Sequence, residues 1–361
     1  MKTLLAKINS NKAMKSNLIT FGMVIGVYII MQILLSAGVV SSLVRGLLVP
    51  LCTYAILAVS LNLTVGILGE LSLGHAGFMC IGAFSSAFFS KCMQDAIPIA
   101  GVRFTIAILI GALSAGLFGL LIGIPVLRLK GDYLAIVTLA FGEITKNIIN
   151  MLYIGIDESG MHFSTKSSLE LNLSDSGVVI IQGAQGITGT PNDASFTAGI
   201  LLLLITLFVI LNLIHSRDGR AIMAIRDNTI AAESIGINIT KYKLMAFSIS
   251  AAFAGTAGVL YAHNLSTLNA TSKNFGYNMS IMILVFVVLG GIGNIRGSII
   301  AAVVLTLLPE LLRGLNDYRM LIYAVALIVM MLFNWAPACI QWREKIMFRL
   351  KTKQKHAKEA E

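Results

Sequence analysis

Long apolar stretches without charge constrain this chain more than any other feature. The clearest runs from Ile200 to Ile214, where thirteen of fifteen residues are Leu, Ile, Val or Phe. A helix needs roughly 20 apolar residues to cross a bilayer. Charged residues make up 12% of the chain, about half of the roughly 25% found in soluble domains. The sequence therefore predicts an all-α fold, a polytopic bundle of membrane helices forming one domain over residues 1–361.

We expect about eight to ten spans, because the weaker stretches either cross the membrane or re-enter it. Three are interrupted by Gly, His or Arg, namely 71–90, 279–295 and 297–312. The segments 46–154 and 244–341 would begin on opposite sides of the membrane, which is compatible with an inverted repeat. The ten candidate spans are 18–38, 46–68, 71–90, 104–127, 133–154, 196–214, 244–262, 279–295, 297–312 and 320–341.

The placement of charge predicts the orientation. The first 17 residues carry four Lys and no acid, and the last 21 carry seven Lys or Arg against three Glu. Basic segments stay in the cytoplasm, so both termini, including the tail 343–361, are expected there, as is the segment 218–243. The acidic stretch 156–195 is then an extracytoplasmic loop, expected to lack regular structure. The net charge of +10 reflects these ends, and no basic patch interleaved with aromatics indicates nucleic acid.

Motifs that would supply catalysis or energy are missing from the sequence. It contains no GxxxxGK[ST] phosphate loop, no HExxH and no GxSG, so neither a bound nucleotide nor a hydrolytic centre is expected. The cysteines form no CxxC pair, which leaves no expected metal or disulfide. They are Cys52, Cys80, Cys92 and Cys339. We therefore expect no cofactor on this chain and regard a membrane-embedded enzyme as the weakest hypothesis.

The segment 218–243 predicts a short amphipathic helix. Gly236 is placed to end the helix. The residues that fall on one helical face are Ile222, Ile225, Thr229, Ala232 and Ile235. Such a helix either docks into a soluble protein or lies on the lipid surface. Its mixed charges favour a protein partner, because a lipid-binding face would be more uniformly basic.

Two glycine clusters and one charged pair lie within apolar stretches. The first cluster is Gly66, Gly69, Gly74 and Gly77, and the second is Gly290, Gly291, Gly293 and Gly297. The glycines either allow broken helices that line a transport path or allow close helix packing. His75 either bonds a neighbouring helix or binds substrate, and we favour the first. Glu143 and Lys146, three residues apart, form a structural pair or a site for a substrate ammonium. The candidate path residues are Ser72, Gly74, His75, Gly77, Glu143, Gly290, Gly291 and Gly293.

Several motifs together resemble the permease family of branched-chain amino acid ABC transporters, in the subfamily that pairs with a shorter permease. They are LGELSLGHAGFMCIGA (68–83), LRLKGDYLAIVTLAFGEI (127–144), GITGTP (186–191), GRAIMAIRDNTIAAESIGINITKYKLMAFSISAAFAGTAGVLYA (219–262) and VVLGGIGNIRGSIIAAVVLTLLPELLR (287–313). The resemblance implies that residues 219–236 receive the stroke of an ATPase. The coupling positions implied are Gly219, Arg220, Arg226, Asp227, Ala231, Ala232 and Gly236.

The resemblance also implies the partners and the location. These are a second related permease, two cytoplasmic ATP-binding subunits that use the ATP, an extracytoplasmic substrate-binding protein, and the lipid of a bacterial inner membrane. The implied activity is import of branched-chain amino acids, although related permeases carry urea and other amides. The alternative from another class is a stand-alone ion-coupled carrier that uses Glu143, Lys146 and His75.

Overall fold

A computed structural model describes residues 2–129, 131–158, 160–174 and 177–312 and isolated positions from 314 to 332, with side chains from residue 17 onward. The chain divides into two compact units, residues 1–303 and 304–361, and the first holds the elements that follow as far as residue 303 of the last helix. The predicted span 320–341, apart from isolated positions, and the tail 343–361 lie outside the described residues. The inverted repeat and the single domain stay predictions.

The polytopic helical fold is confirmed. Within the described ranges, seven helical stretches are long and apolar enough to cross a membrane. Each overlaps a predicted span, with its ends displaced by a few residues. The predicted spans 71–90 and 297–312 correspond to shorter helices outside this set. The seven are Asn17–Ser36, Ser42–Leu68, Ala100–Val126, Asp132–Met151, Phe196–His215, Ile239–Ala262 and Ser272–Gly290.

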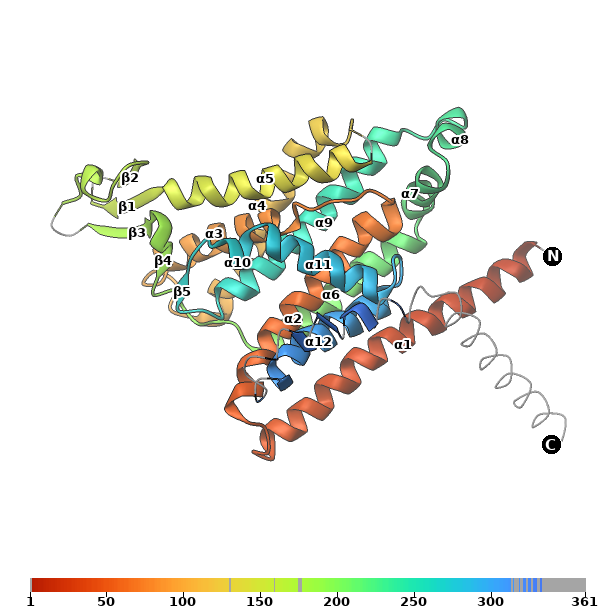
Figure 1. Cartoon of the computed structure of the whole chain (residues 1–361), viewed down its shortest axis with the longest axis horizontal. Coiled ribbons are helices and arrows are strands. Elements are labelled where there is room, and N and C mark those ends of the chain that lie inside the picture. The colour runs from red at the N-terminus through yellow and green to blue at the C-terminus, as the bar shows by residue number, and fades with distance from the viewer. Residues whose placement is uncertain are drawn as a thin grey trace. The chain divides into compact units, whose positions relative to one another are not determined.

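The helices are numbered in chain order, as in Figure 1. A π-helical turn, η1 (Leu63–Leu68), continues α2. The helices are α1 (Lys2–Ser36), α2 (Ser42–Asn62), α3 (His75–Cys92), α4 (Ala100–Val126), α5 (Asp132–Met151), α6 (Phe196–His215), α7 (Arg217–Asp227), α8 (Thr229–Ser234), α9 (Ile239–Ala262), α10 (Ser272–Phe275), α11 (Tyr277–Gly290) and α12 (Ile295–Leu311).

The loop 156–195 is ordered rather than structureless. It carries most of an antiparallel sheet of order β2-β1-β3, in which Ile154 pairs with Phe163 and Ile181. Apolar side chains anchor the sheet, since Ile154, Ile180 and Ile181 are at most 7% exposed, which the charge count did not reveal. The strands are β1 (Tyr153–Asp157), β2 (Gly160–Ser164), β3 (Val178–Gln182), β4 (Ile187–Thr188) and β5 (Thr267–Leu268); the 3₁₀ turns are η2 (Leu169–Leu171) and η3 (Gly183–Gln185).

Small residues bring α3, α4 and α9 together at the centre. A Cβ atom built on Gly82 would lie 2.4 Å from the backbone of Gly255, and one on Gly258 would lie 2.1 Å from the carbonyl oxygen of Met79. Contacts this short leave no room for a side chain, so the backbones are in direct contact. Lipid gives helices no hydrophobic reason to associate, and close backbone approach supplies the dispersion contact instead.

The chain breaks between α2 and α3, and α3 begins inside the bundle. Glu70, just past η1, pairs with Lys243 in the first turns of α9. From there residues 69–74 run in non-helical conformation to His75. The ring of His75 bonds the hydroxyl of Ser60 at 2.8 Å, in the last turn of α2 and eight residues before the end of η1, which continues it. The segment 69–74 therefore returns alongside α2 from its end, as expected for backbone that is buried in protein.

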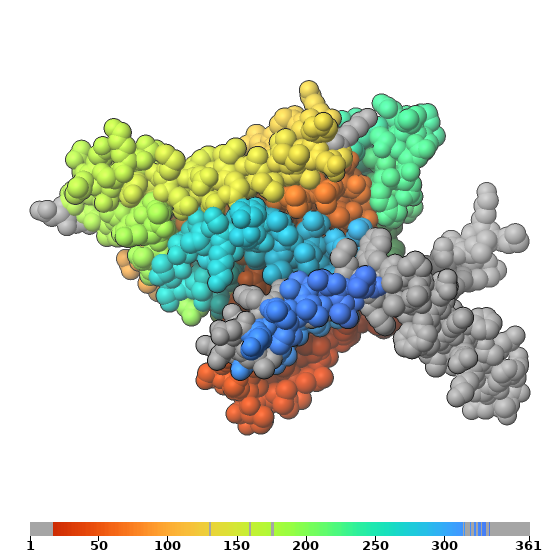
Figure 2. All heavy atoms as spheres, viewed as in Figure 1, coloured from red at the N-terminus to blue at the C-terminus, as the bar shows by residue number. Residues whose placement is uncertain are grey.

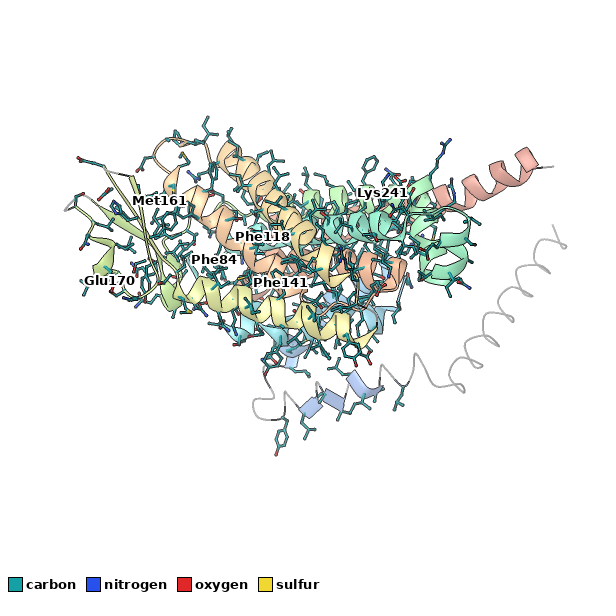
Figure 3. The ribbon with its side chains drawn as sticks, turned by 90° about the horizontal axis from the view of Figure 1, so that it is seen from above. Phe84, Phe118, Phe141, Met161, Glu170 and Lys241 are labelled. Atoms are coloured by element: carbon teal, nitrogen blue, oxygen red, sulfur yellow. The ribbon has the colours of Figure 1, made fainter. Side chains whose placement is uncertain are left out.

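Two features mark opposite ends of the first unit. The sheet β1–β3 lies at one end in Figure 1, and α7 and α8 lie at the other. Figure 3 confirms this from above, with Met161 and Glu170 of the sheet region far from Lys241 at the start of α9. At the sheet's end, Arg103 of α4 forms a buried bidentate pair with Asp193, at 2.8–3.0 Å.

Candidate functional site

The segment predicted as one amphipathic helix is two helices, α7 and α8. Asn228 has an extended backbone (φ −158°, ψ 103°), and its side chain accepts the N–H of Ala231. Asn is a favoured helix cap because its short side chain replaces a missing backbone acceptor. Asn228 thus ends α7 and begins α8, and the helical face counted across residue 228 in the sequence is interrupted there. Gly236 ends α8 as predicted, with φ +83°.

One side of this helix pair is buried and the other presents isoleucine to solvent. Ile222, Ile225 and Ala232 are at most 2% exposed, as the predicted face requires. Ile235, predicted on the same face, is 74% exposed, and Ile230 is 80% exposed. The break at Asn228 explains the difference, because it turns α8 away from the line set by α7. In Figure 2 this mint-green region projects at the end of the unit.

Gly219 and Arg220 serve the junction between α6 and α7. The N–H of Gly219 donates to Ser216 Oγ at 3.0 Å. A Cβ on Gly219 would lie 2.1 Å from the carbonyl oxygen of Leu213, so only glycine fits. Arg220 donates to the carbonyl oxygen of His215 at 3.3 Å, which satisfies an end of α6. Ala231 is exposed beside Ile230, which leaves a small residue at the surface of α8.

Arg226 reaches the π-helical turn that continues α2, while 37% of its side chain stays exposed. Its Nη1 donates to the carbonyl oxygen of Gly66 at 3.0 Å. Its Nε and Nη2 donate to Asp227 Oδ1 at 3.1 and 2.9 Å, so the carboxylate orients the guanidinium. Gly69 lies against its stem, because a Cβ there would lie 2.5 Å from Arg226 Cγ.

The second glycine cluster packs on the same part of α2. Asn62 accepts the N–H of Gly293 at 2.9 Å and donates to Ser298 Oγ at 2.8 Å. A Cβ on Gly66 would lie 2.4 Å from the nitrogen of Gly293. Two further predicted residues shape the turn from α11 to α12. A Cβ added on Gly290 would lie 2.4 Å from the carbonyl carbon of Gly297, and Gly291 has φ +95°.

The first cluster, at the start of α3, is buried against α5 and α11. A Cβ on Gly74 would lie 2.3 Å from Thr138 O, and one on Gly77 would lie 2.7 Å from Gly142 Cα. His75 is 2% exposed and bonded to Ser60, which agrees with the favoured interpretation. Ser72 is 1% exposed, and its hydroxyl is one of two buried side-chain groups without a partner among the described residues.

Glu143 and Lys146 form the predicted pair, at 2.5 Å. Each also has a partner outside α5. Lys146 Nζ donates to Ser272 Oγ at 2.8 Å, and Glu143 Oε1 accepts the N–H of Tyr277 at 2.7 Å. The carboxylate therefore stands at the first residue of α11, where the helix dipole favours negative charge. This geometry gives the pair a structural task, holding α5 to the segment that begins α10 and α11.

One large cavity of the first unit is not lined by the candidate path residues. A largely apolar cavity of about 530 Å³ lies between α3, α4 and α5 and the sheet, and it includes Phe84, Phe118 and Phe141, which Figure 3 places near one another. None of the eight candidate path residues lines it. The structure instead joins the glycines of the α11–α12 turn to α2 and Arg226. Their role in a transport path stays a prediction.

Sequence reasoning missed Asn62, Glu70 and Lys243. Asn62 had a readable signal, because an amide inside an apolar run has to find partners within the protein. The pairing of Glu70 with Lys243 had none, since 173 residues separate them and only the return of the chain after α2 brings them together. Among the described residues, no group of three His, Cys, Asp or Glu side chains is placed to hold a metal ion.

Residues 42–333 match the family described as branched-chain amino acid transport system / permease component. The chain is 36% identical over 316 residues to the high-affinity branched-chain amino acid transport system permease protein LivM of Salmonella typhimurium, covering 85% of this chain and 72% of that protein. Identity to LivM of Escherichia coli is 37% over 293 residues, covering 79% and 66%.

A second permease protein of the same system is also similar. LivH of Salmonella typhimurium is 23% identical over 254 residues, covering 70% of this chain and 79% of LivH. No solved structure matches the chain. The similarity therefore extends to two permease proteins that carry the name of one transport system.

Proposed function

This chain belongs to the family of permease components of branched-chain amino acid transport systems, and from that premise we propose that it imports these amino acids as the membrane subunit of an ABC transporter. ATP would be hydrolysed on separate cytoplasmic subunits. The two kinds of relative, LivM and LivH, support a second, related permease as the partner that completes the path.

The single observation that carries the coupling role is the two-sided helix pair α7–α8. Its inner side is buried against the bundle through Ile222 and Ile225, and its outer side exposes Ile230 and Ile235. Isolated helices of six or eleven residues are unstable in water, so this pair owes its shape to the bundle. An exposed apolar ridge rimmed by charge fits a groove in a soluble protein better than a lipid surface.

The opposite end of the unit supports a second contact. The sheet β1–β3 stands away from α7 and α8 (Figure 1), and the stretch 156–195 carries five acids against one Lys. We propose that this end is extracytoplasmic and meets the substrate-binding protein. The cytoplasmic side, with both termini, would then be the side of α7 and α8.

The test is uptake of labelled leucine into proteoliposomes that contain this chain with its co-expressed permease and ATPases. We expect Ile230→Asp and Ile235→Asp to reduce both uptake and recovery of the ATPases. The control is Leu169→Asp, which places the same charge on an 87% exposed leucine at the opposite end. It should leave recovery of the ATPases unchanged.

The reconstituted chain alone separates this proposal from the ion-coupled alternative. We expect no uptake without the ATPases, whatever ion gradient is applied. Uptake by the isolated chain in a proton or sodium gradient would contradict an ABC permease and favour a carrier.

A further inference from the structure

Three segments distant in sequence meet the π-helical end of α2. Arg226 of α7 reaches the carbonyl of Gly66, and Asn62 holds the α11–α12 turn through Gly293. The ion pair of Glu70 and Lys243 ties the chain after η1 to α9. We name these six residues, Asn62, Gly66, Glu70, Arg226, Lys243 and Gly293, the α2 junction.

The carbonyl of Gly66 is available because of its place in the helix. The last four carbonyls of a helix have no donor within it, and a cation near a helix C-terminus interacts favourably with the dipole. Arg226 supplies both the donor and the charge. Asp227 accepts hydrogen bonds from the other two nitrogens of the guanidinium, so all three nitrogens of Arg226 have a partner.

Gly66 packs directly against Asn62 and the α11–α12 turn. An added Cβ would lie 1.9 Å from Asn62 Oδ1 and 2.4 Å from the nitrogen of Gly293. Asn62 and Ser298, which bond each other, are fully buried. A displacement of α7 that carries Gly66 with it therefore also displaces the turn that begins α12.

The turn Leu63–Leu68 is π-helical, whereas the rest of α2 is α-helical. A π-helical turn uses i→i+5 bonds in place of the i→i+4 bonds of α2, and such turns recur at functional sites. Conversion to an α-helical turn would shift every residue after it, beginning with Gly69 and Glu70, and so would move the segment 69–74 that leads into α3. Coupling between sites requires a two-state element of this kind.

We propose that Arg226 is a positioning residue that passes motion of α7 to the π-helical turn of α2 and, through Asn62, to the α11–α12 turn. This rests on the proposed function, because the motion comes from a partner docked on α8. Within α7–α8 the tasks are then divided. The exposed Ile230 and Ile235 receive the partner, and Arg226 connects the helix pair to the membrane bundle.

The first experiment measures leucine uptake per ATP hydrolysed in the full reconstituted complex. For Arg226→Ala we expect the ATPases to remain bound and active while uptake per ATP falls about tenfold or more, since a charged hydrogen bond is lost. Arg226→Lys, which keeps a charged donor, should recover part of the ratio. Asn62→Leu should show the same uncoupling, and Arg217→Ala, an exposed arginine at the start of α7, should show wild-type values.

A second experiment does not depend on the transported substrate. Hydrogen exchange on the full chain in detergent should be at least about tenfold faster in Leu63–Leu68 and in the α11–α12 turn for Arg226→Ala than for Arg217→Ala. Unchanged exchange, or an unchanged uptake-to-ATP ratio, would overturn the proposal. Loss of the ATPases from Arg226→Ala would also overturn it, because Arg226 would then contact the partner. If Arg226→Ala speeds hydrogen exchange as expected but the wild-type complex moves no leucine, the proposed function alone fails.

Discussion

The pair of Glu143 and Lys146 shows how single residues are placed in this protein. Both charges lie in α5, a span in which a charge costs about 2.5–3.5 kcal/mol by insertion scales. Each offsets that cost twice, through the pair itself and through a second hydrogen bond to the segment around α10 and α11. The charges are therefore compensated within the protein, with Lys146 buried and Glu143 25% exposed.

Removing one charge of this pair should destabilise the protein more than removing both. Glu143→Gln leaves Lys146 buried without a counter-charge, which costs about 3–5 kcal/mol. In Glu143→Gln/Lys146→Met no net charge remains, so most of that loss should be recovered. The midpoint of thermal unfolding in detergent measures both variants. A double variant that is less stable than the single one would show that the charges have a further role.

At the scale of elements, glycine decides which helices touch. The close approaches at Gly82 and Gly258 bring α3 onto α9, and Asn228 decides where α7 ends. The same residue type has no such role in α1, where Gly26 has no atom within 4 Å of an added Cβ. The glycine count alone therefore does not distinguish a packing position from a neutral one.

Gly258→Ala should lower thermal stability, whereas Gly26→Ala should not. The added methyl group in α9 meets backbone atoms of Met79 and Ala83 at 2.1 and 2.9 Å, and overpacking of this kind costs about 1–3 kcal/mol. In α1 the added methyl group of Gly26→Ala meets no other atom, so stability should not fall. Size-exclusion profiles after heating compare the two variants directly. Equal losses in both would contradict the close packing of α3 and α9.

The whole first unit has two chemically different ends. One carries the sheet β1–β3 and the buried pair of Arg103 and Asp193, and the other carries α7, α8 and the α2 junction. Figures 1 and 3 place these ends at opposite extremes of the helices. A transporter that takes solute from one compartment and energy from the other requires such a division.

Labelling of cysteines introduced one at a time tests which end faces the cytoplasm. Leu169→Cys and Ile235→Cys replace side chains that are 87% and 74% exposed, at opposite ends of the unit. A membrane-impermeant maleimide applied to spheroplasts should label the first variant and reach the second only after lysis. Labelling of the chain without either substitution measures the contribution of its four native cysteines. The reverse pattern would place α8 outside and remove the proposed ATPase contact.

The sequence by itself determined the membrane fold, most span positions and the amphipathic character of residues 218–243. These follow from local properties, namely apolar run length, charge placement and helical periodicity. Only the tertiary structure decided that Arg226 turns inward to Gly66 and that the loop 156–195 forms a sheet. It also decided that residues 69–74 return alongside α2. The physical reason is that unsatisfied carbonyls and buried charges take partners from wherever the chain brings them, and Glu70 and Lys243 share no sequence periodicity that foretells their contact.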